Sequence, residues 1–412
     1  MTRLGQGAEP RRPAFKTVVN LLLVFVLLYL FLGGIGMLGQ GVKELGKNPQ
    51  YNKDAPVEGV RKYRDVVYEV FSYAENPLVG LFIGILATSI FQSSSFTTSF
   101  AVSLVVTTPL ALHQAIPIIM GANIGTSVTA VGVSFAHVRR ADEFERAYGA
   151  AIVHDFYKTL TVLLLFPLEW IVWRLTGQGF LERLSLALAR TFSGGAAAGE
   201  EPTNVLRVVV NPLVQGAERL LGDGLGLGHV PVNIVLTVLG LVLLFAALIY
   251  LTVILRNLVL LRVERVFDQV LFRNAAAAFV VGLALTSVVQ SSSVTTSLAV
   301  PLAGAGLLTI SQVYPYMLGA AIGTTVTALI ASFATSADTP ALAEVGVALA
   351  FAHTLFNVLG SAVWYLFRRV PISMATWFAR IAGHSSRWAV MYVAGFFFVL
   401  PILVIGAYWL LK

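Results

Sequence analysis

The chain has 412 residues, of which 57% are hydrophobic and only 12% are charged. Ordinary soluble domains carry about 25% charged residues, so this composition excludes a soluble globular protein and favours a membrane protein. The formal net charge of +7 does not indicate nucleic-acid binding, because many of the cations flank apolar stretches, as in cytoplasmic loops of membrane proteins. The absence of cysteine excludes disulfides, thiolate metal sites and cysteine catalysis.

Several apolar stretches are long enough to cross a hydrocarbon layer as helices, which takes about 20 residues. They include residues 17–38, 233–255, 345–367 and 388–411. The first follows four cations, but it is too long for a signal-peptide core and lacks a clear cleavage site, so we expect a retained transmembrane helix. The sequence therefore predicts an all-α polytopic membrane protein with a cytoplasmic N-terminus.

One polar phrase interrupts this apolar background twice. It is Gln-Ser-Ser-Ser-Phe-Thr-Thr-Ser at 92–99 and Gln-Ser-Ser-Ser-Val-Thr-Thr-Ser at 290–297, 198 residues further on. An isolated Ser/Thr pair in a membrane helix usually bonds to a carbonyl or joins two helices. Two matched octets carry more polar groups than one neighbouring helix can satisfy, which favours a substrate or ion site built by two halves.

The apolar flanks of the first phrase, residues 76–91 and 100–106, are each shorter than a normal span. This length predicts a re-entrant hairpin or a broken helix that bends at the serines, and the second copy repeats the pattern. Irregular backbone at that depth has to line a cavity filled by protein or water.

A second duplicated segment has the same spacing. Gly-Ala-Asn-Ile-Gly-Thr-Ser at 121–127 corresponds to Gly-Ala-Ala-Ile-Gly-Thr-Thr at 319–325. The Gly-x-x-x-Gly pattern is typical of close helix packing in membranes, whereas the hydroxyl residues that follow favour ligation at an unwound turn. Both interpretations stay open.

The constant spacing indicates a duplication, and loop charges orient its copies. Arg139, Arg140 and Arg146 follow the first core, whereas the equivalent loop at 332–342 has no Lys or Arg. We therefore predict two inverted-topology repeats. The predicted organisation is a first repeat at 1–175 with its core at 76–136, an extracellular or periplasmic loop at 176–232, a second repeat at 233–367 with its core at 274–331, and a cytoplasmic loop and final transmembrane helix at 368–412.

Within the long loop, residues 204–221 have amphipathic spacing interrupted by Pro212, and we expect them to lie along the membrane interface. The Gly/Ala-rich stretch 193–199 is typical of a flexible linker. The connection at 41–75 is also expected outside the cell.

The duplicated cores are poor in charge. No acidic residue lies between Glu75 and Asp142, and no charged residue lies between Arg273 and Asp338. Oxygen atoms would hold a cation there, while hydroxyls, backbone N–H groups and helix N-termini would hold an anion. A bare anion is costly in such a place, so the pattern favours cation-coupled anion uptake. It argues against an enzyme, because neither core has convergent carboxylates or a nucleophile–base pair.

Three ionisable residues, His154, Asp155 and Lys158, lie inside the apolar stretch 148–172. Such residues in a membrane are functional suspects, but their helical spacing favours a cluster that satisfies itself on one helix. The second copy has His353 without the charged neighbours, which argues against a symmetrical proton relay.

The paired Gln-Ser-Ser-Ser phrases, the segment Ile-Pro-Ile-Ile-Met-Gly-Ala-Asn-Ile-Gly-Thr-Ser at 116–127 and His154-Asp155-Phe156 closely resemble the type II sodium-dependent phosphate cotransporter family. The resemblance covers about residues 17–405 and implies sodium-coupled symport of inorganic phosphate by alternating access. It implies no cofactor beyond co-transported sodium, no enzymatic activity, and a multi-pass protein of the cell (inner) membrane whose C-terminus is extracellular or periplasmic. Transport of another oxyanion such as sulfate, an anion channel, and a homodimer stay open.

The ligands that the resemblance implies fall on the duplicated phrases. For phosphate they are Ser93, Ser94, Ser95, Ser291, Ser292 and Ser293. For sodium they are Gln92, Asn123, Thr126, Ser127, Gln290, Ser293, Thr295, Thr324 and Thr325. The chain departs from the family at Ala320-Ala321, where Ser-Asn is expected, so the second glycine phrase lacks one polar side chain. It also lacks the aspartate that electrogenic members carry near the first repeat and the cysteines that bridge the external loop of animal members. These two absences favour a bacterial-type, electroneutral transporter.

Overall fold

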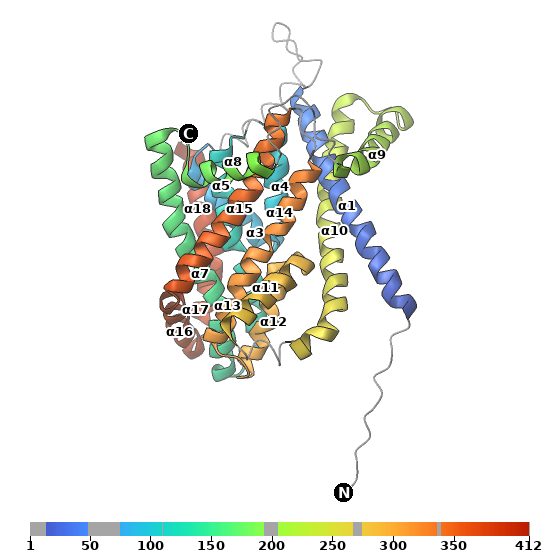
Figure 1. The fold of residues 1–412 in the computed structure, drawn as a ribbon. Coiled ribbons are helices and arrows are strands. Elements are labelled where there is room, and N and C mark those ends of the chain that lie inside the picture. The colour runs from blue at the N-terminus through green and yellow to red at the C-terminus, as the bar shows by residue number, and fades with distance from the viewer. Residues whose placement is uncertain are drawn as a thin grey trace.

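The computed structural model describes residues 14–47, 75–108, 110–192, 205–266, 274–335 and 339–411, and within these ranges every regular element is a helix (Figure 1). Seven helices of the described chain are long and apolar enough to cross a membrane. They are Val18–Leu45, Leu112–His137, Ala141–Thr176, His229–Leu255, Ile310–Phe333, Pro340–Leu366 and Arg387–Leu411. The predicted all-α, multi-pass membrane protein is therefore confirmed.

The same order of helices occurs in both halves of the chain. The first half contains α1 (Ala14–Lys47), α3 (Pro77–Phe91), α4 (Ser94–Thr107), α5 (Leu112–Gly125), α6 (Ser127–Ser134), the 3-10 turn η1 (Phe135–His137), α7 (Ala141–Thr176) and α8 (Phe180–Phe192). The second contains α10 (His229–Val266), α11 (Ala275–Val289), α12 (Ser292–Gly304), α13 (Ile310–Gly323), α14 (Thr325–Ala334), α15 (Pro340–Leu366) and α16 (Arg369–His384). Between the halves lie α9 (Val205–Arg219) and η3 (Leu220–Gly224), and the chain ends with α17 (Arg387–Ala394), η5 (Gly395–Val399) and α18 (Leu400–Leu411).

Equivalent asparagines start the short helices α3 and α11. Asn76 Oδ1 accepts a hydrogen bond from Leu78 N at 3.0 Å, and Asn274 Oδ1 accepts one from Ala277 N at 2.8 Å. Each bond satisfies an N–H that the first helical turn leaves unpaired. Both helices have 15 residues and are about 22 Å long at 1.5 Å per residue, which is short of the ~30 Å hydrocarbon layer.

Glycines bring α3 against α5 and α11 against α13 without intervening side chains. A Cβ atom added at Gly121 would overlap the carbonyl oxygen of Leu81, and one at Gly319 would overlap that of Phe279. The glycine phrases therefore serve close packing of backbones, one of the two interpretations that the sequence left open.

The first helices of the two halves, α1 and α10, lie side by side and run in opposite directions (Figure 1). Gly34 of α1 packs against Leu244 of α10, and Gly41, further along α1, packs against Asn233, which comes earlier in α10.

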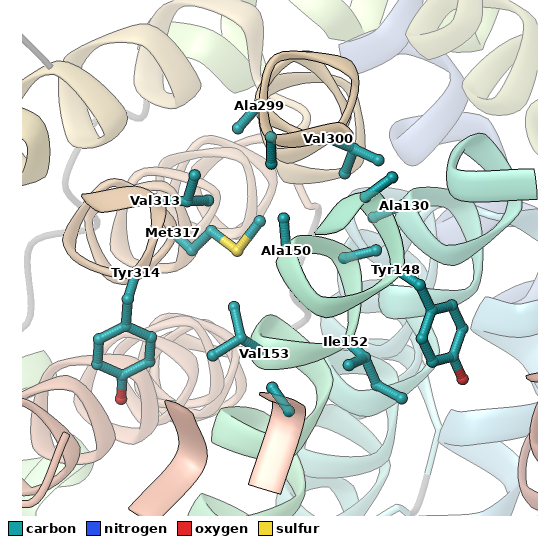
Figure 2. Close-up of a cluster of buried hydrophobic side chains, with 14 of the residues drawn as sticks. Ala130, Tyr148, Ala150, Ile152, Val153, Ala299, Val300, Val313, Tyr314 and Met317 are labelled. Atoms are coloured by element: carbon teal, nitrogen blue, oxygen red, sulfur yellow. The ribbon is translucent and has the colours of Figure 1, made fainter. Parts of the chain in front are cut away.

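Helices of each half also pack on the other half. From the first half, α4 contacts α14 and α15 of the second half, and from the second half, α12 contacts α6 and α7 of the first. Figure 2 shows a buried cluster at the second of these contacts, where Ala150 and Val153 of α7 lie near Val300 of α12 and Met317 of α13. The core of the molecule is thus shared between the halves.

Two segments predicted as loops contain helices. The loop predicted to begin at residue 176 starts with α8, which packs on α15, and the C-terminal loop contains α16, which packs on α7. In α16 the small side chains Ala375, Ala379 and Ala382 are buried, so its amphipathic spacing has a packing role.

The amphipathic segment predicted at 204–221 forms α9 with Pro212 inside the helix. Its Val210 and Val214 pack against Gly36 of α1, so this face lies on protein. Some predictions fall on positions outside the described residues. These are residue 204, the predicted linker 193–199, most of the connection 41–75, Arg273 and Asp338.

Candidate functional site

Each Gln-Ser-Ser-Ser phrase lies where one short helix ends and another begins. Gln92 ends α3 with φ of 51°, and Gln290 ends α11 with φ of 56°. In the described chain these are the only residues other than glycine with positive φ. A left-handed conformation costs a residue with a Cβ about 1–3 kcal/mol, and such outliers gather at functional sites.

A serine begins the next helix in both copies. Ser93 Oγ accepts a hydrogen bond from Phe96 N at 3.2 Å, and Ser291 Oγ accepts one from Val294 N at 3.4 Å. The first serine of each phrase is therefore an N-cap, and the N-terminal ends of α4 and α12 begin at the two breaks.

Buried threonines hold the helices of each pair together. Thr88 Oγ1 donates to Thr97 Oγ1 at 2.9 Å, and the equivalent hydroxyls of Thr286 and Thr295 lie 2.7 Å apart. Thr295, a predicted sodium ligand, thus takes part in closing the second pair.

The two phrases meet in the interior. Ser95 Oγ donates to the carbonyl oxygen of Gln290 at 2.8 Å and lies 3.5 Å from Thr324 Oγ1. Thr327 Oγ1 donates to the same carbonyl at 3.4 Å. This junction brings together three predicted ligands that come from three separate segments of the chain.

Several buried polar groups near the breaks have no protein partner among the described residues. Ser94, Ser292 and Ser293 are 3–5% exposed, and their hydroxyls make no hydrogen bond there. Gln290 Oε1 is also buried without a partner among these residues. Leaving a buried polar group unsatisfied costs about 1–3 kcal/mol, so these groups are available to a ligand.

The remaining candidates are used differently. The side chain of Gln92 is exposed and makes no hydrogen bond with the described residues. Thr126 Oγ1 donates to Ala122 O at 3.0 Å, and Thr325 Oγ1 donates to Ile322 O at 2.8 Å. Each hydroxyl therefore bonds to a carbonyl of the preceding helix, α5 for Thr126 and α13 for Thr325.

The unwound turn that the sequence offered for the glycine phrases is not observed. Thr126 separates α5 from α6 with φ and ψ of −58° and −29°, and Thr324 separates α13 from α14 with −65° and −20°. These are helical values, so the interruptions are a single residue long and leave the chain direction nearly unchanged.

Two of the ionisable residues of α7, His154 and Lys158, contact polar residues of the first glycine phrase. Ser127 Oγ lies 3.5 Å from His154 Nδ1, and Asn123 Oδ1 accepts a hydrogen bond from Lys158 Nζ at 2.7 Å. Asp155 Oδ2 accepts a hydrogen bond from the hydroxyl of Tyr392 on α17. The expected cluster that satisfies itself on one helix is therefore wrong, because its partners come from other helices.

Sequence reasoning did not single out Tyr392. It placed Asn357 of α15 only as a residue that replaces the charges of the first copy, and it did not predict that the Asn357 oxygen accepts a second hydrogen bond from Lys158. A signal for Asn357 exists. It follows His353 by four residues, as Lys158 follows His154.

These features define a class of protein: a multi-pass membrane protein whose two halves meet at paired helix breaks lined by buried hydroxyls. Residues 62–155 and 238–367 match the model of the Na+/Pi-cotransporter family, and the chain belongs to this family.

Mammalian relatives support the assignment. Sodium-dependent phosphate transport protein 2B of Homo sapiens is 29% identical over 477 residues, which cover 95% of this chain and 66% of the relative. Sodium-dependent phosphate transport protein 2A of Oryctolagus cuniculus is 31% identical over 468 residues, covering 98% of this chain and 69% of the relative. The chain spans about two thirds of the length of these relatives. No solved structure matches the chain significantly.

Proposed function

We propose that this protein is a secondary transporter that couples sodium movement to the uptake of inorganic phosphate by alternating access. Membership of the Na+/Pi-cotransporter family supports this function, and so do the names of its relatives. The observation that carries the proposal is the hydrogen bond from Ser95 to the Gln290 carbonyl, because it joins the polar breaks of both halves in one buried place.

Phosphate would be bound at the starts of α4 and α12. The unpartnered hydroxyls of Ser94, Ser292 and Ser293 would donate to its oxygens, and Ser95 would exchange its bond to Gln290 for one to the anion. Ser93 and Ser291 would hold the helix N-termini, whose free N–H groups and dipoles favour an anion. The carbonyl oxygens and hydroxyls at the junction, those of Gln290 and Thr324 among them, would bind sodium beside it.

The halves would be inverted repeats, and each pair of short helices would be a re-entrant hairpin. The opposite directions of α1 and α10 and the reciprocal packing between the halves support this arrangement. The short lengths of α3 and α11 support the hairpins. Exposure of the junction to one side of the membrane and then to the other would give alternating access.

We place the protein in the cell membrane with its N-terminus in the cytoplasm. Arg139 and Arg140 are exposed beside the end of the first core, which supports a cytoplasmic position for this turn. Seven crossings would then put the end of α18 on the opposite side.

Uptake of radiolabelled phosphate into proteoliposomes tests the function. An inward sodium gradient should drive accumulation, and a sodium ionophore or replacement of sodium by choline should abolish it. Competition by sulfate would extend the substrate to other oxyanions. Uptake that ignores the gradient would refute the coupling, and flux that does not saturate would favour a channel.

A further inference from the structure

Lys158 lies in the interior of the protein, with 1% of its surface exposed. Its Nζ donates hydrogen bonds to Asn123 Oδ1 at 2.7 Å and to Asn357 Oδ1. Asn123 belongs to α5 in the first half of the chain, and Asn357 belongs to α15 in the second. The nitrogen is therefore held by amide oxygens from both halves.

Internal hydrogen bonds turn both amide oxygens toward Lys158. Asn123 Nδ2 donates to the Ile119 carbonyl at 2.9 Å, and Asn357 Nδ2 donates to the His353 carbonyl at 2.9 Å. Asn357 Nδ2 also lies 3.2 Å from Asn123 Oδ1, so the two amides contact each other. The pair of oxygens is thus fixed by contacts that do not involve the lysine.

Two aromatic rings complete the surroundings of the ammonium. Nζ lies 5.3 Å from the ring centroid of Tyr157 and 5.9 Å from that of Phe356. The faces of aromatic rings attract cations. No carboxylate of the described chain pairs with Nζ, because Asp155 bonds to Tyr392 instead. Neutral oxygens and aromatic faces, with no carboxylate among them, are typical of a site that holds a monovalent cation.

We propose that Asn123 and Asn357 form a cation site between the two halves and that Lys158 fills this site with a tethered ammonium in place of a mobile sodium ion. The ammonium and sodium carry the same charge and both bind amide oxygens. The fixed charge lies next to Asn123 of the first glycine phrase and would balance an anion bound between the duplicated cores, which carry no acidic residue. A transporter with this tethered ammonium would move one fewer sodium ion per cycle than one whose site holds a mobile sodium ion. This consequence for coupling rests on the proposed function, whereas the cation site itself does not.

The second half of the chain supplies the natural test variant. Asn357 occupies the position equivalent to Lys158, four residues after a buried histidine. Lys158→Asn therefore removes the ammonium and offers a third amide oxygen to an ion. Lys158→Met removes the charge, keeps most of the volume and offers no oxygen, which makes it the matched control.

Binding of radioactive sodium to the purified full-length protein, without phosphate, measures the effect. Lys158→Asn should bind one additional sodium ion per chain relative to the wild type, and Lys158→Met should bind none in addition. The double variant Lys158→Asn/Asn357→Leu should lose the gain. Equal sodium binding in Lys158→Asn and wild type would overturn the inference.

Thermal unfolding gives a second readout. Replacing N-methyl-D-glucamine chloride by NaCl should raise the Tm of Lys158→Asn by about 3 °C more than that of the wild type, because a bound ion stabilises the folded state. If Lys158→Asn folds only in NaCl, that dependence supports the proposal. If it folds in neither salt, sodium does not replace the ammonium and the proposal fails.

The two proposals fail separately. A wild type without sodium-driven phosphate uptake, combined with an extra sodium ion in Lys158→Asn, would reject the transport function and keep the site. Sodium-driven uptake by the wild type, combined with no extra sodium ion in Lys158→Asn, would keep the transport function and reject the cation site.

Discussion

Ser95→Ala tests the junction between the halves most directly. Ser95 is 5% exposed, and its hydroxyl donates to the Gln290 carbonyl at 2.8 Å. Thr327 still donates to that carbonyl at 3.4 Å, so the acceptor is not left without a partner. The expected loss of stability is therefore small, about 0.5–1.5 kcal/mol for one hydrogen bond.

The effect on transport should be larger than the effect on stability. If the hydroxyl is a ligand, its loss costs about 1–3 kcal/mol of binding, which corresponds to a rise of about 5- to 150-fold in the apparent dissociation constant for phosphate. Phosphate and sodium titrations of uptake in proteoliposomes, together with Tm measurements, separate the two effects.

Thr107→Val provides the control on the same helix. Thr107 is the last residue of α4, and its hydroxyl donates to the Ser103 carbonyl of the same helix at 2.8 Å. Its removal should leave both apparent affinities unchanged and should cost about 0.5–1.5 kcal/mol of stability, as for Ser95→Ala. Unchanged apparent affinities for phosphate and sodium in Ser95→Ala would refute the placement of the site at this junction.

Three further variants test other features. Ser293→Ala should raise the KM for phosphate uptake without lowering Tm, because its hydroxyl makes no protein hydrogen bond in the described chain, and a parallel loss of Tm would contradict this. Gly121→Ala should lower the free energy of unfolding by about 1–3 kcal/mol or prevent folding, because its Cβ would overlap Leu81 O. Gly216→Ala, where the added Cβ meets no other atom, should leave stability unchanged or raise it. Circular dichroism melting compares the two variants. Glu169→Ala should speed hydrogen exchange at the start of α8, whose N–H groups its carboxylate accepts, and unchanged protection there would contradict that role.

The sequence predicts the positions of the helix breaks well, because the same phrase occurs twice in an apolar background. Gln92 and Gln290 both adopt the left-handed conformation, and a serine caps the next helix each time. The sequence predicts the bend but not the left-handed glutamines or the serine caps, which are local features of the bend that the structure adds.

Contacts between distant segments are harder to predict. The bond between Ser95 and Gln290 spans 195 positions, and helical periodicity does not specify which helices meet. The same limit explains the error on Lys158. Spacing along α7 favoured Asp155 as its partner, but tertiary packing brought Asn123 and Asn357 closer.

The glycine contacts determine which parts of the molecule can move. Where a carbonyl of α3 lies against Gly121 of α5, one helix cannot slide past the other without separating the two backbones. The same holds for α11 and α13 at Gly319, and for α1 and α10 at Gly34. Each of these pairs is therefore expected to move as a rigid body. Relative motion is left to the boundaries between pairs, and the junction of Ser95 with Gln290 is on such a boundary, where exchangeable hydrogen bonds replace close-packed backbones.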